Sequence, residues 1–189
     1  MRLYPARMDR TQIAAEIAKV ALLRGTFTLR SGKTSHYYLD KYLFSTRPEI
    51  LRELGRLFAE RVPKGTVRLA GAELGGIPLV SAASMASGLP CLFVRNARKD
   101  YGTGKQLEGK LDRGDRVVFV EDVATTGGQA LEAVKVLREA GAQVTHVICT
   151  IDRMEGARAN VQAAGVAFDA LFTVADLGIT PDPAPQPTA

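Results

Sequence analysis

Two adjacent carboxylates followed by a turn of small residues are the part of this sequence best suited to chemistry. Residues 117–130 read Val-Val-Phe-Val-Glu-Asp-Val-Ala-Thr-Thr-Gly-Gly-Gln-Ala. The apolar run Val117–Val120 is typical of a strand buried on both faces, and we expect it to end at Glu121 and Asp122. A helical pattern starts at Gln129. The spacing therefore predicts a strand, a turn and a helix start.

This predicted turn suits a phosphate group. Amides of the turn and of the first helical turn lack backbone partners, and the helix dipole adds partial positive charge. Thr125 and Thr126 add hydroxyl groups, and Gly127 and Gly128 allow a close approach of the backbone. Carboxylates would repel the phosphate, so we expect them to face sugar hydroxyls or a metal. The predicted ligand is a ribose 5-phosphate; the alternative is an ordinary connection in a doubly wound sheet.

Two further segments are expected at the same edge of the sheet, where open α/β sheets bind ligands. Glu73–Pro78 is a second small-residue turn, whose glycine backbone suits a pyrophosphate or merely a tight turn. Arg153 follows a predicted strand and is suited to bind a planar carboxylate. A surface ion pair of Arg153 with Asp152 or Glu155 is an equal alternative.

The long polar segment 96–109 also favours function. It carries three glycines and several basic residues and shows little apolar periodicity. We expect a mobile cationic lid hinged at Gly102, Thr103 and Gly104, and the alternative is a solvated loop.

Composition is that of one globular domain. The 189 residues are 46% apolar and 24% charged, which is ordinary for a soluble protein with a real core. No apolar run reaches the roughly 18 residues that span a membrane, and Met1–Arg10 lacks the apolar segment of an export signal. We therefore expect a cytoplasmic protein. Cys91 and Cys149, in predicted buried strands, are expected to be free thiols.

The net charge of +5 favours a polyanionic small substrate. Basic residues concentrate in the segment 95–105, and no nucleic-acid-binding motif is present. We expect neither a nucleic acid nor a membrane as partner.

The remaining periodicity predicts alternating helices and strands. Expected helices are Arg10–Leu23, Pro48–Val62, one that runs through Met85–Ser87, and Arg158–Gly165. Expected strands are Val67–Ala72, Cys91–Arg95, Val144–Ile151 and Phe168–Val174. Phe27–Asp40 is predicted to form a hairpin, and the proline-rich Pro181–Ala189 a disordered tail.

The stretch from about Phe27 to Gly156 resembles the orotate branch of the type I phosphoribosyltransferase family. The motifs that carry the resemblance are Phe-Thr-Leu-Arg-Ser-Gly-x-x-Ser, Arg95 followed by Lys99-Asp-Tyr-Gly, the signature Glu121–Gln129, and Asp152-Arg153. The resemblance implies an α/β fold with a central, mostly parallel sheet flanked by helices. It implies one domain over residues 1–180, with a hood formed by roughly residues 1–45 and C-terminal elements.

The resemblance also implies an activity. This is Mg²⁺-dependent transfer of a phosphoribosyl group from phosphoribosyl pyrophosphate to orotate, in pyrimidine biosynthesis. Mg²⁺ would be held mainly by substrate and water. A homodimer is implied, with the loop 96–109 shared across the interface. The alternatives are a purine-type phosphoribosyltransferase and a ligand-sensing regulator.

The site residues implied by the resemblance fall into three groups. The catalytic group is Lys99, Arg95 and Asp122. The group that binds phosphoribosyl pyrophosphate is Glu121, Asp122, Val123, Ala124, Thr125, Thr126, Gly127, Gly128, Gln129, Leu74, Gly75, Arg95, Lys99 and Tyr101. The orotate group is Arg30, Tyr38, Thr125 and Arg153. The sequence departs from the family pattern at Arg30, often lysine, at Asn96 and Tyr101, and at Leu74-Gly75, which is Tyr-Lys in some members.

Overall fold

A six-stranded sheet forms the centre of the molecule. The computed structural model describes residues 7–28, 34–96 and 106–180. The strand order is β5-β4-β3-β6-β7-β8, and all neighbours are parallel except β4 and β5. The strands are β3 (Arg68–Ala72), β4 (Cys91–Val94), β5 (Leu107–Glu108), β6 (Arg116–Ala124), β7 (Gln143–Asp152) and β8 (Ala167–Thr173). The predicted α/β class with a mostly parallel sheet is confirmed.

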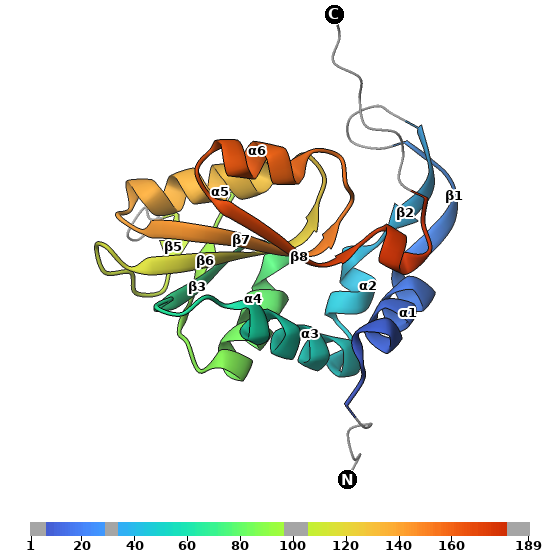
Figure 1. Cartoon of the computed structure of the whole chain (residues 1–189), viewed down its shortest axis with the longest axis horizontal. Coiled ribbons are helices and arrows are strands. Elements are labelled where there is room, and N and C mark those ends of the chain that lie inside the picture. Colours follow the sequence, from blue (N-terminus) through green and yellow to red (C-terminus); the bar gives the residue numbers. More distant parts are fainter. Residues whose placement is uncertain (1–6, 29–33, 97–105, 181–189) are drawn as a thin grey trace, which may run out of the picture.

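Helices cover both faces of this sheet (Figure 1). One face carries α3 (Pro48–Arg61) and α4 (Gly76–Ser87), and the other carries α5 (Gly128–Glu139) and α6 (Ala157–Ala163). Successive residues of a strand point to opposite faces. In β6, Val118 and Val120 accordingly join the core beneath α3 and α4, whereas Val117 and Phe119 join the core beneath α5 and α6. This two-sided burial explains the uninterrupted apolar run.

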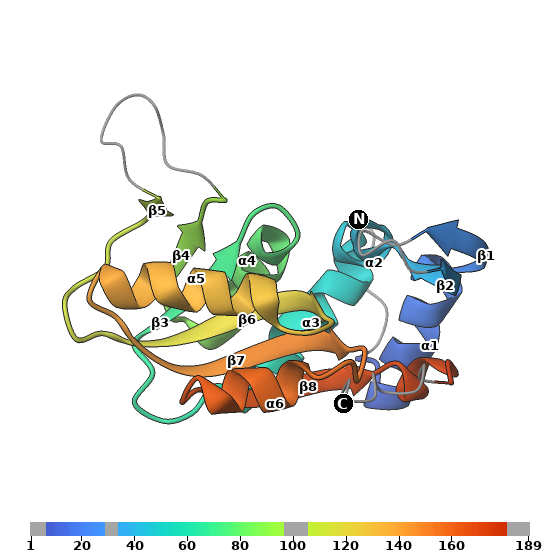
Figure 2. The same cartoon turned by 90° about the horizontal axis from the view of Figure 1, so that it is seen from above.

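The N-terminal hood lies beyond one end of the sheet (Figure 2). We use this name for α1 (Arg10–Ala21), β1 (Leu22–Thr28), β2 (Thr34–Leu39) and α2 (Lys41–Ser45). The C-terminal 3₁₀ helix η1 (Ala175–Leu177) packs on α1, and Arg10 donates to both carboxylate oxygens of Asp176 at 3.0 and 2.8 Å. Ile13 and Ile17 of α1 belong to the same apolar cluster as the α3 side of the sheet. The hood and the sheet therefore share a core.

Polar contacts fix where the first helix begins. The Asp9 side chain accepts from the amide of Gln12 at 2.8 Å, and the Gln12 side chain accepts from the amide of Asp9 at 2.9 Å, a capping box. The expected helix to Leu23 is two residues too long, because Leu22 already pairs with Leu39 in the hairpin.

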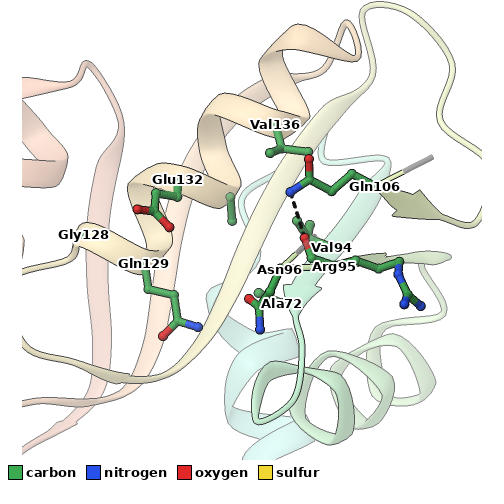
Figure 3. A pocket seen from close by; sticks show the side chains of 10 residues that line it. Ala72, Val94, Arg95, Asn96, Gln106, Gly128, Gln129, Glu132 and Val136 are labelled. Carbon is green, nitrogen blue, oxygen red and sulfur yellow. Dashed lines mark hydrogen bonds between the residues drawn. The ribbon is translucent and has the colours of Figure 1, made fainter. Parts of the chain in front are cut away.

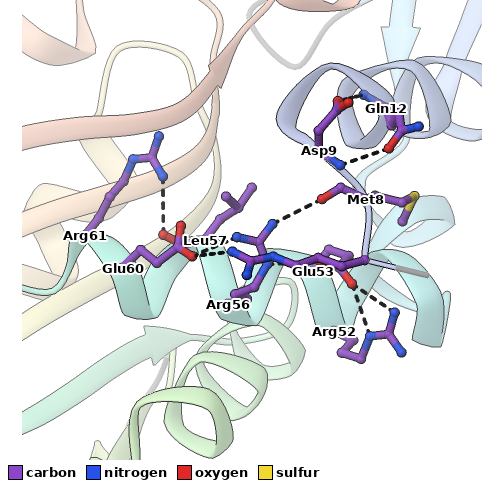
Figure 4. A network of polar contacts seen from close by, with 10 residues as sticks. Met8, Asp9, Gln12, Arg52, Glu53, Arg56, Leu57, Glu60 and Arg61 are labelled. Carbon is purple, nitrogen blue, oxygen red and sulfur yellow. Dashed lines mark hydrogen bonds and ion pairs between the residues drawn. The ribbon is translucent and has the colours of Figure 1, made fainter. Parts of the chain in front are cut away.

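A second network joins this N-terminal segment to α3 (Figure 4). The carboxylate of Glu53 is buried and receives Arg52 Nη2 at 2.9 Å and Arg56 Nε at 3.0 Å. Arg56 also donates to the carbonyl of Met8 at 3.3 Å and to Oε1 of Glu60 at 2.8 Å. Because Glu53 is paired on both sides, its burial is compensated.

Several expected boundaries were wrong. β6 does not stop at the acidic pair but runs to Ala124, because Val123 and Ala124 still pair with β7. The strand β5 lies within the segment expected to be a loop, and α2 was not expected. Cys91 is only half buried, although Cys149 is buried as expected, and both thiols are free. The predicted tail at residues 181–189 and the turn at residues 29–33 lie outside the described residues.

Among the helices that the structure describes, none has the length and apolar character needed to cross a membrane.

Candidate functional site

Three parallel strands deliver the predicted site residues to one edge of the sheet. β3 leads into the turn Glu73–Gly76, β6 into the turn Thr125–Gly127, and β7 into Arg153. The amide of Arg153 donates to the carbonyl of Ala124 at 2.9 Å, so two of these strand ends are joined directly. The signature turn and Arg153 therefore lie at the same edge of the sheet, as expected.

The turn Thr125–Gly127 is held from behind by α6. The carbonyl of Thr125 accepts from the amide of Ala157 at 3.1 Å, and the carbonyl of Thr126 accepts from the Asn160 side chain at 2.9 Å. Gly127 has φ of +81°, and a Cβ there would lie 3.1 Å from Val161, so glycine fits both the backbone and the packing. Thr125 and Thr126 remain exposed. Their hydroxyls and the start of α5 are available to an anion.

The acidic pair Glu121–Asp122 is buried. The two residues are 5% and 3% exposed, and the amide of Asp122 donates to Oε1 of Glu121 at 3.0 Å. Burial, reinforced by the neighbouring Asp122 carboxylate, raises the pKa of Glu121 to about 8. Glu121 is therefore mainly protonated at neutral pH, while Asp122 has a cationic partner.

That partner is Lys41, which sequence reasoning missed. Its Nζ lies 2.7 Å from Oδ2 of Asp122. Burial would lower the pKa of Lys41, but the Asp122 carboxylate outweighs it and the pKa is raised. No local motif marks Lys41, because its proximity to Asp122 depends on how the hood folds onto the sheet.

The turn after β3 lies against the same carboxylate. Its Glu73–Leu74 peptide bond is cis. Gly75 is buried, and a Cβ there would overlap Oδ2 of Asp122. Oε1 of Glu73 accepts from the amide of Asn96 at 2.7 Å, which attaches the turn to the residue that begins the 96–109 segment. Leu74 is 66% exposed. The glycine thus allows the turn to approach the acidic pair.

Arg153 is a buried cation between the hood and the sheet. It is 8% exposed, and its Cζ lies 5.0 Å from the centroid of the Tyr37 ring. Its Nε lies 2.8 Å from Oε1 of Glu155, an ion pair outside hydrogen-bond geometry. Within the described part of the chain, its Nη2 has no hydrogen-bond partner. Arg153 therefore retains a donor for a ligand.

A cavity of about 540 Å³ adjoins the start of α5 (Figure 3). One wall carries Gln129 and Glu132, and the other carries Arg95 and Asn96. Gln106 donates to the carbonyl of Arg95 at 2.9 Å, and the Arg95 guanidinium lies 3.9 Å from Glu108 and points away from Gln129 in Figure 3. The structure thus places Arg95 near the signature but directs its side chain elsewhere.

Of the remaining candidate residues, the structure describes Tyr38 but not the other three. Tyr38 is 45% exposed, and its ring centroid lies 5.7 Å from that of Phe27 in the hairpin. Arg30, Lys99 and Tyr101 lie outside the described residues. Their roles stay predictions.

Comparison with known proteins supports one family. Residues 44–170 match the phosphoribosyl transferase domain model. An orotate phosphoribosyltransferase from Natronomonas pharaonis is 48% identical over 153 residues, which are 81% of this chain and 87% of that protein.

Solved structures similar to this chain support the same family. Orotate phosphoribosyltransferase of Mycobacterium tuberculosis in complex with Fe(III) dicitrate has a TM-score of 0.81 and 31% identity, covering 91% of this chain and all of that one. The same enzyme in complex with 5-phospho-α-D-ribosyl 1-diphosphate has a TM-score of 0.77 and 30% identity, with 91% and 100% coverage. The chain therefore belongs to the phosphoribosyl transferase domain family, in its orotate phosphoribosyltransferase branch.

Proposed function

We propose that this chain transfers the 5-phosphoribosyl group of phosphoribosyl pyrophosphate to orotate, giving orotidine 5′-monophosphate and pyrophosphate in pyrimidine biosynthesis. The observation that carries this proposal is the buried guanidinium of Arg153 beside the turn Thr125–Gly127, with Nη2 unpaired in the described residues. A buried cation with a donor to spare suits a carboxylate, and the neighbouring turn suits a phosphate.

In this reaction N1 of orotate forms a bond to C1′ of the sugar, the bond from C1′ to the pyrophosphate oxygen breaks, and the proton of N1 passes to the leaving pyrophosphate or to water. The negative charge of orotate lies on its carboxylate, and the work that we assign to the protein is alignment and compensation of charge on the leaving oxygens. Thr125–Gln129 would hold the 5′-phosphate, and Glu121 with Asp122 the ribose hydroxyls. Protonated Glu121 can donate to a hydroxyl oxygen, whereas the Asp122 carboxylate accepts from one. The pair is therefore matched to groups that both donate and accept.

The ends of the substrates would be bound by residues outside the signature. Leu74 and Gly75 would contact the pyrophosphate through the turn backbone. Lys99 and Tyr101 of the 96–109 segment would bind it together with Arg95, which precedes that segment. Arg153 would bind the orotate carboxylate, together with Arg30, Tyr38 and Thr125.

We include Mg²⁺ as the cofactor. No cluster of three or more His, Cys, Asp or Glu side chains suited to a metal occurs among the described residues, and Oδ2 of Asp122 already pairs with Lys41. This donor set fits an ion held mainly by substrate and water oxygens, as Mg²⁺ often is. When bound, Mg²⁺ supplies positive charge to the pyrophosphate oxygens.

We also propose a homodimer. Apolar side chains are accessible in the turn before α4 and along that helix: Leu74 is 66% and Met85 82% exposed, and Ile77 and Pro78 are only half buried. Such a face favours association with another protein surface. Leu74 also belongs to the proposed pyrophosphate turn, so this exposed apolar surface borders the site. We propose that the 96–109 segment is shared across the interface of the dimer.

A spectrophotometric assay tests the function. Orotate absorbance is followed with phosphoribosyl pyrophosphate and Mg²⁺, and again with adenine or hypoxanthine in place of orotate. We expect consumption of orotate alone, abolished by a chelator and restored by added Mg²⁺. Turnover of a purine base without turnover of orotate would replace the proposal by a purine-type transferase.

A further inference from the structure

A lysine of the hood reaches the acidic pair of the site. Lys41 is the first residue of α2, and the Asp40 side chain accepts from the amide of Tyr42 at 3.0 Å, which fixes the start of this short helix. The Lys41 ammonium lies 2.7 Å from Oδ2 of Asp122. A side chain anchored in the hood thus ends beside a residue of β6.

Lys41 also lies against the turn that follows β3. A Cβ on Gly75 would be 3.2 Å from Cε of Lys41 and would overlap Oδ2 of Asp122. The missing side chain at Gly75 leaves the room in which lysine and carboxylate meet. Leu74 and Gly75 carry no charge themselves, so the structure supplies positive charge to this turn from Lys41.

The two partners of the ion pair differ in their exposure to solvent. The Asp122 side chain is 4% exposed, whereas that of Lys41 is 29% exposed. An ammonium group has three donors, and Asp122 accepts one of them. As far as the described residues extend, Lys41 therefore has donors available at the accessible side of the pair, where a polyanion would arrive.

We propose that Lys41 is a substrate-binding residue that contacts the pyrophosphate group of phosphoribosyl pyrophosphate at the turn Glu73–Gly76. This inference rests on the proposed function and adds a residue to it. In the free protein Lys41 compensates Asp122. In the complex the ribose hydroxyls bind Asp122, and the ammonium shares its donors with the pyrophosphate oxygens. Neither the buried Asp122 carboxylate nor the half-buried Lys41 ammonium is left without a partner at any stage, which avoids a large desolvation cost.

Binding measurements on Lys41→Gln test this role. Dissociation constants are measured by calorimetry, with Mg²⁺, for phosphoribosyl pyrophosphate, for pyrophosphate and for orotidine 5′-monophosphate, which lacks the pyrophosphate group. Losing a charged hydrogen bond should weaken the first two ligands about 10- to 100-fold. Orotidine 5′-monophosphate should change by less than about 3-fold, since its ribose contacts Asp122 rather than Lys41. Lys41→Arg should recover part of the affinity because it keeps the charge.

Lys19→Gln is the matched control. Lys19 lies in α1 of the same hood and forms an exposed ion pair with Glu16 at 3.4 Å. Its loss removes the same charge and should leave all three dissociation constants unchanged. If this control weakened pyrophosphate as much as Lys41→Gln does, long-range charge would explain the effect and the proposal would be wrong.

Two other results would overturn the proposal. Equal weakening of orotidine 5′-monophosphate and phosphoribosyl pyrophosphate would mean that Lys41 acts only through Asp122. A lower melting temperature with unchanged affinities would mean that the ion pair only stabilises the packing of the hood on the sheet. Lysine-dependent pyrophosphate binding in a protein that does not consume orotate would instead support the inference and contradict the proposed function.

Discussion

The guanidinium carbon of Arg153 lies 5.0 Å from the centroid of the Tyr37 ring, so a residue at the end of β7 is packed on an aromatic residue of the hood. Tyr37 is 8% exposed and contributes to the same apolar cluster as the sheet. A cation over an aromatic face gains electrostatic energy when both are shielded from water. The contact therefore holds the planar guanidinium in one orientation.

Arg153→Lys should impair orotate binding selectively. Lysine keeps the charge but loses the planar fork that matches a carboxylate and stacks on Tyr37. We expect the KM for orotate to rise about 10- to 100-fold, the loss of one to two charge-assisted hydrogen bonds. The KM for phosphoribosyl pyrophosphate should change little. Steady-state kinetics with each substrate varied in turn provide the measurement.

Arg158→Lys is a suitable control for this substitution. Arg158 also lies over an aromatic ring, that of Phe168 at 5.1 Å, and donates to a backbone carbonyl at 2.9 Å, but it belongs to α6. Its replacement should leave both KM values unchanged. A similar rise in both KM values for Arg153→Lys would show that this arginine supports the site as a whole.

The protonation of Glu121 should make stability depend on pH. Its pKa is raised from 4.5 to about 8 in the folded protein, because burial and Asp122 disfavour the charged form. The folded state thus binds a proton that the unfolded chain releases between these pH values. The associated stability is fully present below about pH 4.5 and is lost as pH rises through about 8, by at most about 1.4 kcal/mol per pH unit.

Glu121→Gln replaces this titrating carboxyl group by an amide that does not titrate. Denaturant unfolding at pH 5, 6, 7 and 8 should show the free energy of unfolding of the parent protein falling relative to that of the variant. Titrating groups far from Glu121 are shared by both proteins and cancel in the difference, which therefore reports on Glu121 and the Asp122 carboxylate beside it. If the difference in unfolding free energy between the two proteins stayed constant from pH 5 to pH 8, Glu121 would be ionised in the folded state.

Gly55→Ala should destabilise the packing of α3 on α4. Alanine would gain about 1 kcal/mol of helix propensity. Its Cβ, however, would lie 2.6 Å from the carbonyl oxygen of Ala82, a backbone atom that cannot rotate away. We expect the clash to prevail and the free energy of unfolding to fall by about 1–3 kcal/mol. Chemical denaturation measures this change.

Gly128→Ala is the control for replacing a helical glycine by alanine where no clash results. At the first position of α5, the nearest atom to an added Cβ would be Oγ1 of Thr126 at 3.7 Å, an ordinary contact. Its unfolding free energy should stay within about 0.5 kcal/mol of that of the parent protein. A stabilised Gly55→Ala protein would mean that the two helices separate readily.

Local patterns were sufficient for much of the fold and part of the site. The run Val117–Val120 carried enough apolar and β-branched character to predict the central strand, and the spacing of small residues predicted the turn beside it. The end of β6 was missed, because pairing with β7 overrides the change to acidic residues. Lys41 was missed for a related reason: its pairing with Asp122 is a long-range contact between elements, which no local spacing encodes.

A mixing experiment tests the proposed sharing of the 96–109 segment. Lys99→Ala and Asp122→Asn proteins should each be nearly inactive alone, because each loses a proposed catalytic charge. If the segment acts across a two-fold dimer, a mixed dimer contains one site with Asp122 from one subunit and Lys99 from the other. Random exchange makes half of the dimers mixed, so activity should recover to about a quarter of the parent value.

The control partner carries both substitutions in one chain. Mixing Lys99→Ala with the double variant gives no site that has both residues, so no recovery is expected. If the segment acted within its own subunit, both mixtures would stay inactive. Recovery in the first mixture alone would require subunits that exchange and share their sites, since neither chain can then supply both charges to its own site.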